Sequence, residues 1–302
     1  MTDITQQFAQ FVANSPLVLL DNPFPEPLPI RLFLKRDDML HPLVSGNKWR
    51  KLKYNLLAAR AQGLDTVLTF GGAFSNHLYA TAAAGRVFGF NTIGVVRGDE
   101  LAGAPLNPTL AFCRSQGMRL HFVSREEYRQ KEDPFWLSAL TDRFGPCYVV
   151  PEGGTNERAI RGTAEIMPEI LAQSDQVPDY VCCSVGTGGT VIGLAQAAPP
   201  PTMVVGFLAL KASSFVLPQP ARCRLETSYH FGGYAKTTPQ LLDFIRAFEQ
   251  RTHVRMEQVY TGKMLYGIYD LAQQGYFSVG ATVVAVHTGG LQGRSPLLNQ
   301  AG

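Results

Sequence analysis

Segments typical of buried strands alternate with segments typical of helices along most of this chain. The strand-like segments are residues 65–70, 92–97, 119–123, 147–150, 179–185, 204–210 and 281–286. Helical patterns cover residues 76–88, 109–117, 157–171, 240–250 and 263–274. This alternation predicts βαβ units, in which parallel strands form sheets that helices cover on both faces.

Glycine-rich loops follow four of these strands, at positions 71–72, 153–154, 186–189 and 289–290. In sheets of this kind, ligands bind beyond the carboxyl ends of the strands. The four glycine loops are therefore candidates to line one cleft.

One lysine lies at the junction of a turn and a predicted helix. Ser45, Gly46 and Asn47 are typical of a turn and helix cap, and Lys48 follows them. The helix dipole disfavours an ammonium at this end, and Lys51 adds a second positive charge one turn later. Both effects lower the pKa of Lys48 and favour a nucleophilic amine, as a Schiff base requires. An ordinary solvated lysine is the alternative that this stretch leaves open.

The helix that begins near Lys48 is predicted to be amphipathic. Its spacing places apolar residues on one face, namely Trp49, Leu52, Leu56 and Ala59. The other face carries polar residues, namely Arg50, Lys51, Lys53 and Asn55.

A glycine-rich loop joins the strand at 179–185 to a predicted helix that begins near Val191. The loop offers backbone N–H groups, a helix dipole and two threonine hydroxyls to an anion; its residues are Gly186, Thr187, Gly188, Gly189 and Thr190. The spacing fits neither the G-x-G-x-x-G dinucleotide pattern nor a Walker loop. A phosphate site without a nucleotide motif, together with a nucleophilic lysine, predicts pyridoxal 5′-phosphate (PLP) as the cofactor.

Composition limits the partners that this chain can have. The 302 residues are 45% apolar, and the net charge is only +3 with scattered basic residues, so we expect no nucleic-acid partner. Residues 1–14 do not resemble a secretory signal, and no apolar run approaches the roughly 20 residues of a membrane span. The five cysteines and six histidines lack metal-site spacing. We therefore expect a soluble cytoplasmic protein with no membrane partner and no metal.

Several of these motifs occur together in the order typical of one enzyme family. They are Lys48, Ser75-Asn76-His77, the loop at 185–190, Tyr260-Thr261-Gly262-Lys263 and the stretch at 287–290. The chain, from residue 34 to residue 290, resembles the family of 1-aminocyclopropane-1-carboxylate (ACC) deaminase and D-cysteine desulfhydrase, which are PLP enzymes of fold type II.

The resemblance implies a two-domain α/β fold with parallel-rich twisted sheets and helices on both faces. The large PLP-binding domain would comprise residues 1–50 and 147–302, and the small domain residues 51–146. The resemblance also implies a homodimer that acts on a small amino acid.

The resemblance further implies which residues bind the cofactor. Lys48 resembles the lysine that binds PLP as a Schiff base and shuttles protons. Asn76 resembles the asparagine that contacts the phenolic oxygen of the cofactor. The phosphate site would be formed by Lys51 with Val185, Gly186, Thr187, Gly188, Gly189 and Thr190.

Other matching residues would bind the substrate or assist the reaction. Ser75, Asn76 and His77 resemble the loop that receives the substrate carboxylate, a role that suits a hydroxyl and backbone donors at a helix start. Tyr234 and Tyr260 resemble the two active-site tyrosines. For Tyr234, the alternative is a loop aromatic residue that packs on the core.

Two further cofactor-binding candidates, Thr261 and Thr288, bear on the reaction. ACC deaminases carry glutamate and leucine at these positions, whereas desulfhydrases carry threonines as here. A glutamate would keep the pyridine nitrogen protonated, and a threonine cannot, which leaves a weaker electron sink. Opening a cyclopropane without an α-hydrogen demands more of the cofactor than loss of a thiolate. The pair therefore predicts α,β-elimination from D-cysteine or a relative, which yields pyruvate, ammonia and sulfide.

The chain also departs from the family pattern near the substrate loop. Phe74 and Tyr79 stand where family members usually carry glutamine and arginine, and residues 235–238 differ from the usual continuation after Tyr234. These departures leave other small charged β-substituted alanines as alternative substrates. ACC deamination is the alternative reaction. A PLP-binding protein with little catalysis is the alternative from another class, and the response of the cofactor spectrum to amino acids would discriminate it.

Overall fold

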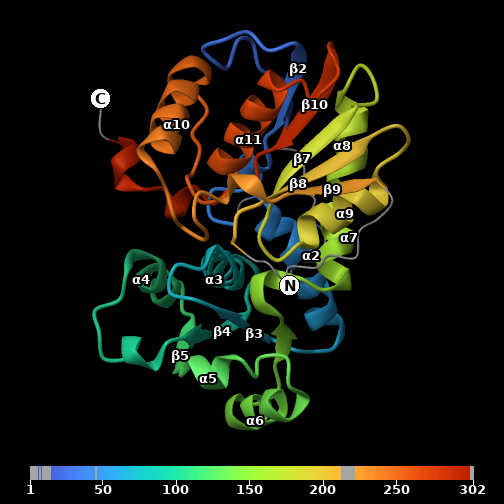
Figure 1. Ribbon diagram of the computed structural model, residues 1–302. Helices are drawn as coiled ribbons and strands as arrows, with labels where there is room; N and C mark the ends of the chain where they lie inside the picture. Colours follow the sequence, from blue (N-terminus) through green and yellow to red (C-terminus); the bar gives the residue numbers. More distant parts are fainter. Residues whose placement is uncertain (1–5, 7, 9–14, 45, 212–221, 300–302) are drawn as a thin grey trace. The chain divides into compact units, whose positions relative to one another are not determined.

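The structure is a computed structural model. It describes residues 6, 8, 15–44, 46–211 and 222–299. The chain divides into two compact units (Figure 1). Among the described residues, unit 1 comprises residues 6, 8 and 41–162, and unit 2 comprises residues 15–40 and 163–299.

Unit 1 contains a four-stranded parallel sheet with the strand order β5-β4-β3-β6. The strands are β3 (Thr66–Gly71), β4 (Asn91–Arg97), β5 (Arg119–Val123) and β6 (Tyr148–Val150). Its helices are α2 (Asn47–Ala61), α3 (Asn76–Phe88), α4 (Pro108–Ser115), α5 (Arg125–Tyr128) and α6 (Pro134–Phe144), with 3₁₀ turns η2 (Asp99–Leu101) and η3 (Glu152–Gly154).

Helices cover both faces of this sheet (Figure 1). On one face, Leu78 of α3 and Leu110 of α4 pack in a cluster with Val96 of β4. On the other face, Tyr128 of α5 and Leu140 of α6 pack in a second cluster with residues of β3, β4 and β5. The sheet is therefore buried on both sides, as parallel sheets usually are.

Unit 2 contains a six-stranded sheet with the order β1-β2-β10-β7-β8-β9, in which only the β1–β2 pair is antiparallel. The strands are β1 (Leu17–Leu19), β2 (Ile30–Lys35), β7 (Tyr180–Val185), β8 (Met203–Leu208), β9 (Cys223–Glu226) and β10 (Ala281–Val286). The helices are α8 (Ile166–Gln173), α9 (Gly189–Ala197), α10 (Pro239–Thr252) and α11 (Thr261–Gln273), with 3₁₀ turns η1 (Asp37–Met39), η4 (Ser228–His230), η5 (Leu291–Gly293) and η6 (Pro296–Asn299). Helix α7 (Glu157–Ala164) contains the boundary between the units.

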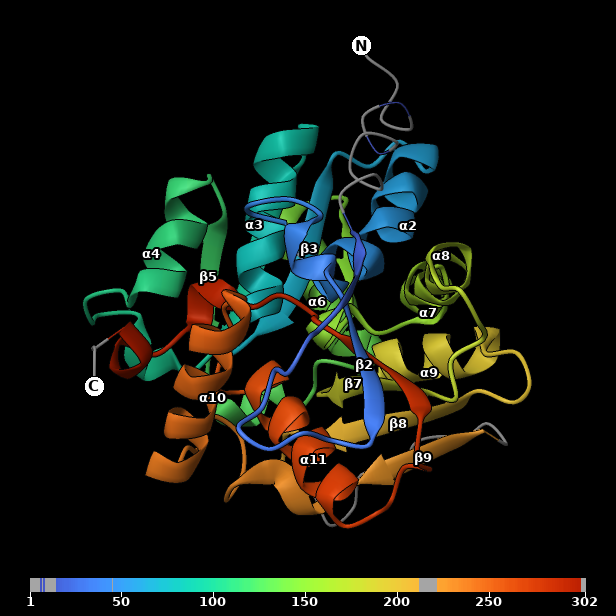
Figure 2. The same cartoon turned by 90° about the horizontal axis from the view of Figure 1, so that it is seen from above.

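Figure 2 shows α10 and α11 on one face of the six-stranded sheet and α8 and α9 on the other. An extensive apolar cluster joins Ile245 of α10 and Met264 of α11 to Leu34 of β2 and Val283 of β10. The predicted α/β class, with parallel-rich sheets and helices on both faces, is confirmed.

The predicted strands and helices match those of the structure closely, except that one predicted helix is divided into two. The strands at 119–123 and 281–286 and the helix at 76–88 have the predicted bounds. The single helix predicted at 157–171 is instead two helices, α7 and α8, that meet at Glu165.

The units divide the chain at other positions than the expected 50/51 and 146/147. Unit 1 includes α2 and extends to Gly162. Long-range polar contacts account for this, because the Oδ1 atom of Asn55 in α2 accepts from Tyr148 at 3.2 Å and from Nδ2 of Asn156 at 2.8 Å. These contacts tie α2 to β6 and the residues after it.

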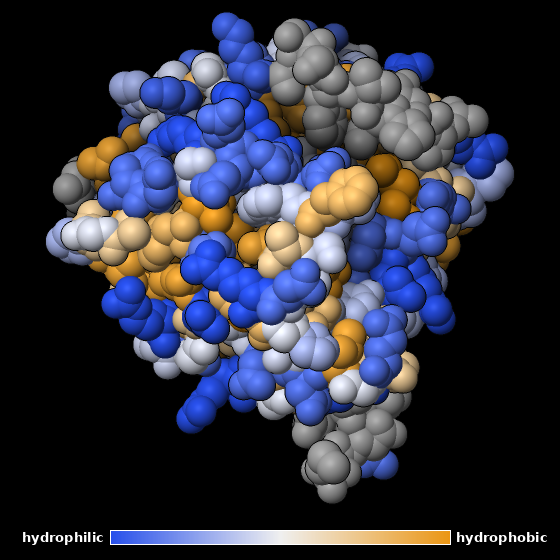
Figure 3. Space-filling view, turned by 90° about the horizontal axis from the view of Figure 1, so that it is seen from below, coloured by the Kyte–Doolittle hydropathy of each residue, from blue (hydrophilic) through white to orange (hydrophobic). Residues whose placement is uncertain are grey.

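In the part of the chain that the structure describes, no helix has both the length and the apolar character to cross a bilayer. On the face that Figure 3 shows, hydrophilic residues interrupt the hydrophobic ones.

Candidate active site

Lys48 is the second residue of α2, as the sequence predicts. The N-cap residue is Gly46, whose φ of 65° lies in the left-handed region. Ser45, the other predicted cap residue, lies outside the described residues. The Nζ atom of Lys48 donates to Oδ1 of Asn47 at 2.7 Å. The amine is thus held in the first turn of a helix, where the backbone dipole disfavours its charged form.

Both faces of α2 are buried. The predicted apolar face is inside unit 1 at every position, namely Trp49, Leu52, Leu56 and Ala59. The predicted polar face is also buried at three of its four positions, Arg50, Lys51 and Asn55. The pattern therefore predicts the apolar face correctly but does not reveal that polar residues are buried opposite it.

Lys51 is buried against the loop that follows β6. Its Nζ atom donates to the carbonyl of Gly153 at 3.1 Å and to Oγ1 of Thr155 at 2.9 Å. These oxygens stabilise a buried ammonium. The expected contact of Lys51 with a phosphate stays a prediction.

Ser75 caps the amino end of α3. Its Oγ atom accepts from the backbone N–H of Leu78 at 3.2 Å. The chain before it passes very close, since a Cβ atom on Gly71 would lie 2.5 Å from this Oγ atom. Only glycine fits at position 71 without a shift of the serine. The hydroxyl of Ser75 and the first turn of α3, which begins at Asn76, therefore lie directly at the carboxyl end of β3.

The two residues that depart from the family pattern occupy different environments. The side chain of Phe74 is 66% exposed. The ring of Tyr79 stacks on Phe112 of α4, with centroids 3.7 Å apart and planes at 11°. Tyr79 thus joins α3 to α4, a packing role that an arginine would not fill in the same way.

His77 is buried beneath this loop as a neutral ring. Oγ1 of Thr69 donates to the carbonyl of Val150 at 2.8 Å, so it accepts from Nε2 of His77, also at 2.8 Å. Nδ1 is then a bare acceptor, buried without a partner among the residues that the structure describes. Burial, with the charges of Lys48 and Lys51, holds the pKa of His77 well below its ordinary value of 6.5. A substrate contact by residue 77 would therefore come from its backbone.

The predicted anion loop lies between β7 and α9. Gly188 is the N-cap residue with a φ of 87°, and α9 begins at Gly189. A glycine N-cap has no side chain to accept from the first N–H groups of the helix, which leaves that role to another acceptor. The hydroxyl of Thr163 donates to the carbonyl of Gly189 at 2.9 Å. The loop therefore fits a phosphate group bound by backbone donors.

Tyr260 lies beside this loop at the start of α11. A Cβ atom on Gly186 would come within 3.2 Å of its ring. The backbone N–H of Tyr260 donates to the carboxylate of Glu257 at 2.9 Å. The ring of Tyr234, which is 46% exposed, meets that of Tyr260 edge-on with centroids 6.1 Å apart. Within unit 2, the two tyrosines and the glycine loop are thus neighbours.

The two threonines have different partners. Oγ1 of Thr261 donates to Oε1 of Glu257 at 3.0 Å, beneath the first turn of α11. The hydroxyls of Thr288 and Ser184 lie 3.2 Å apart, where β10 and β7 end side by side. Burial raises the pKa of Glu257, although the hydrogen bonds that it accepts from backbone N–H groups act to lower that pKa.

Three residues of this region were not singled out as site residues from the sequence, namely Ser184, Glu257 and Lys263. The Nζ atom of Lys263 donates to the carbonyls of His230 at 2.9 Å and Gly233 at 2.8 Å, and so holds the loop that carries Tyr234. Burial lowers the pKa of Lys263 to about 8. Its sequence signal is its place in the motif Tyr260-Thr261-Gly262-Lys263.

The predicted site residues fall into two groups. Unit 1 holds Lys48, Lys51, Ser75, Asn76 and His77. Unit 2 holds the loop at 185–190 with Tyr234, Tyr260, Thr261 and Thr288. The residues that the structure describes include no cluster of three or more histidine, cysteine or acidic side chains that could hold a metal. A lysine at a helix start and an uncapped glycine loop before α9 fit PLP.

Comparison with known proteins agrees with this chemistry. Residues 8–205 match the family of pyridoxal-phosphate dependent enzymes. A protein of Pyrococcus horikoshii named as a candidate 1-aminocyclopropane-1-carboxylate deaminase is 30% identical, over 87% of this chain and 85% of its own. The bifunctional D-cysteine desulfhydrase/1-aminocyclopropane-1-carboxylate deaminase of Arabidopsis thaliana, a mitochondrial protein, is also 30% identical, over 87% and 73%. The crystal structure of an ACC deaminase homologue superposes with a TM-score of 0.75 at 26% identity, over 95% of both chains.

Proposed function

Since this chain belongs to the family of pyridoxal-phosphate dependent enzymes that includes ACC deaminases and D-cysteine desulfhydrases, we propose that it catalyses α,β-elimination from D-cysteine or a similar small amino acid. The substrate would lose its α-proton and its β-substituent, and water would then release ammonia and pyruvate. With a thiol as the leaving group, the third product is sulfide.

The hydroxyl pair of Ser184 and Thr288 is the observation that carries this proposal. Both groups are buried at the carboxyl ends of two adjacent strands. Hydroxyls bind a pyridine nitrogen without keeping it protonated, which suits the loss of a good leaving group. Thr261 is less suited to that contact, because its hydroxyl is already bound to Glu257. This supports Thr288 as the neighbour of the cofactor ring.

When bound, PLP supplies the electron sink for carbanion chemistry. We assign the Nζ atom of Lys48 to cofactor attachment and to removal of the α-proton. Lys51 and the six residues at 185–190 would hold the phosphate group, while Asn76 would contact the phenolic oxygen. These assignments rest on the helix starts at α2, α3 and α9, where backbone N–H groups favour anions.

The substrate carboxylate would bind at the start of α3. The Ser75 hydroxyl accepts from Leu78 and still has its own hydrogen to donate. The backbone N–H groups of Asn76 and His77 would add further donors. Tyr260 or Tyr234 would protonate the leaving group, since the two rings are neighbours that meet edge-on.

The proposal is tested by giving the PLP-loaded enzyme D-cysteine and ACC separately. We expect pyruvate and sulfide from D-cysteine, and none from the Lys48→Ala variant. Formation of 2-oxobutyrate from ACC alone would overturn the argument from Ser184 and Thr288.

ACC deamination is the second candidate, because the Arabidopsis relative is named for both reactions. Equal rates with both substrates would indicate such a bifunctional enzyme. A cytoplasmic location, which rests on the composition of the chain, and a homodimer, which rests on the resemblance, remain parts of the proposal. Sedimentation would test the homodimer.

A further inference from the structure

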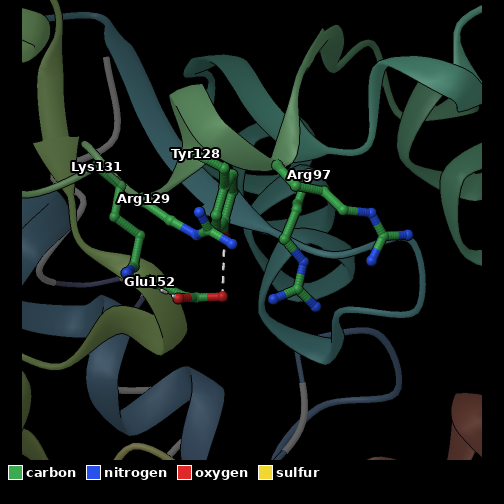
Figure 4. Close-up of a pocket in the computed structure, with 6 residues that line it drawn as sticks. Arg97, Tyr128, Arg129, Lys131 and Glu152 are labelled. Carbon is green, nitrogen blue, oxygen red and sulfur yellow. Dashed lines mark hydrogen bonds and ion pairs between the residues drawn. The ribbon is translucent and has the colours of Figure 1, made fainter.

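A basic pocket in unit 1 lies outside the residues assigned above. It has a volume of about 260 Å³ and is lined by Arg97, Arg125, Tyr128, Arg129, Lys131 and Glu152 (Figure 4). Arg97 ends β4, Glu152 follows β6, and the other four residues follow β5. The pocket thus lies at the carboxyl edge of the sheet, where parallel sheets bind ligands.

Tyr128 and Glu152 form the centre of this pocket. Tyr128 is buried, and its hydroxyl donates to Oε1 of Glu152 at 2.8 Å. The Nζ atom of Lys131 lies 3.6 Å from the other carboxylate oxygen. Burial and the neighbouring charge of Glu152 raise the pKa of Tyr128. The one carboxylate of the lining therefore already has two partners.

The arginines are left with an excess of positive charge. Within the described ranges of the chain, neither Arg97 nor Arg129 has a carboxylate oxygen within 4 Å. Arg125 pairs at 2.9 Å with Glu100, on an exposed stretch outside the pocket lining. In Figure 4, Arg97 and Lys131 lie on opposite sides of the Tyr128 ring. Lys131 also lies 3.8 Å from a carboxylate oxygen of Glu132, so the excess positive charge is that of Arg97 and Arg129. A bound anion would relieve their repulsion.

We propose that this pocket binds a small dianion, such as a phosphate group. One guanidinium group can donate two parallel hydrogen bonds to two oxygens of a phosphate group. Arg97 and Arg129, which have no carboxylate partner within 4 Å among the described residues, are the candidates for this contact. The volume lies below the roughly 300–1,000 Å³ typical of larger organic ligands. A Cβ atom on Gly72 would lie 3.5 Å from Nη2 of Arg97, so the anion would sit beside the loop that leads to Ser75.

The dianion has two sources with the same chemistry. It is either a free phosphorylated metabolite or a distal anionic group of the amino-acid substrate. The site itself does not depend on the proposed reaction, since binding is measured without turnover.

Calorimetric titration of the PLP-loaded full chain with sodium sulfate tests the site, because sulfate keeps its double charge throughout the useful pH range. We expect one site at low ionic strength that weakens as salt is added. The double variant Arg97→Gln with Arg129→Gln should bind sulfate at least tenfold more weakly. Arg119→Gln is the matched control, because Arg119 is an exposed arginine at the amino end of β5.

Unchanged sulfate affinity in the double variant, or no binding to the wild type at low ionic strength, would overturn the proposal. The visible absorption of the cofactor, followed in the same titration, shows that sulfate has not displaced PLP. Competition between sulfate and an amino acid that carries a distal phosphate group indicates the distal group of the substrate, and simultaneous binding of the two indicates a separate anion. Failure of the D-cysteine assay would leave either binding result intact.

Discussion

The ring of Tyr260 lies against Gly186, so closely that a Cβ atom on the glycine would come 3.2 Å from Cε1 and 3.5 Å from the hydroxyl oxygen of the tyrosine. The backbone N–H of Tyr260 is held by the carboxylate of Glu257. The position of this ring is thus coupled to the size of the residue that begins the anion loop.

We expect Gly186→Ala to displace the Tyr260 ring by a few tenths of an ångström and to weaken PLP binding. The loss should stay below about tenfold, or about 1.4 kcal/mol, because the ring can shift without unfolding the strand. Titration of the unloaded protein with PLP measures it. Gly103→Ala is the control, since a Cβ atom there meets nothing within 4 Å. Equal affinities in the two variants would contradict the coupling.

The Lys48→Ala variant should lose turnover by roughly 10²–10⁴-fold or more, because the proton-transfer group is removed. The visible absorption of the covalently attached cofactor should disappear with it. Lys53→Ala is the control. Lys53 lies on the same helix but is not an assigned site residue, and its Nζ atom lies over the Tyr54 ring, 5.0 Å from the ring centre. A Lys48→Ala protein with normal turnover would rule out the assigned role.

Lys263→Met should loosen the loop that carries Tyr234, because the carbonyls of His230 and Gly233 lose their donor. We expect kcat to fall by roughly tenfold, equivalent to about 1.4 kcal/mol in the barrier, with a smaller change in KM. Lys236→Met, which replaces an exposed lysine of the same loop, should leave both constants unchanged. A fall in both variants would instead indicate a general effect of charge.

The same variant should change how stability depends on pH. The pKa of Lys263 is lowered from 10.5 to about 8 by burial, so the unfolded chain binds more protons between these values. The free energy of unfolding contributed by this group therefore rises with pH from about 8 to 10.5. Denaturant unfolding at pH 8 and pH 10 should show a rise for the wild type relative to Lys263→Met. A constant difference would contradict the lowered pKa.

Gly162→Ala should strongly destabilise unit 1. A Cβ atom at this position would lie 2.0 Å from the backbone carbonyl oxygen of Arg50, and backbone atoms cannot move aside as a side chain can. We expect the free energy of unfolding to fall by about 3 kcal/mol or more. Denaturant titration of this variant beside Gly103→Ala measures the difference, and similar midpoints would show that α7 adjusts freely.

Much of the fold follows from local patterns. The alternation of strand and helix segments determined the α/β class, because side-chain period and turn residues act over a few positions. The helix start at Lys48 and the glycine loop before α9 are equally local, since capping and dipole effects end within one turn. These local features are enough to indicate the cofactor chemistry without any long-range contact.

Tertiary structure decided which polar groups lose water and what replaces it. The burial of Lys51 depends on Gly153 and Thr155, about a hundred positions away in the chain. The neutral state of His77 likewise depends on burial and on the charges of Lys48 and Lys51, and its tautomer depends on Thr69. The basic pocket is formed by residues at the carboxyl ends of three strands. The local hydrophobic pattern of each strand does not show that these residues come together. Desolvation and long-range hydrogen bonds are properties of the folded chain, so the sequence specifies them only through the fold.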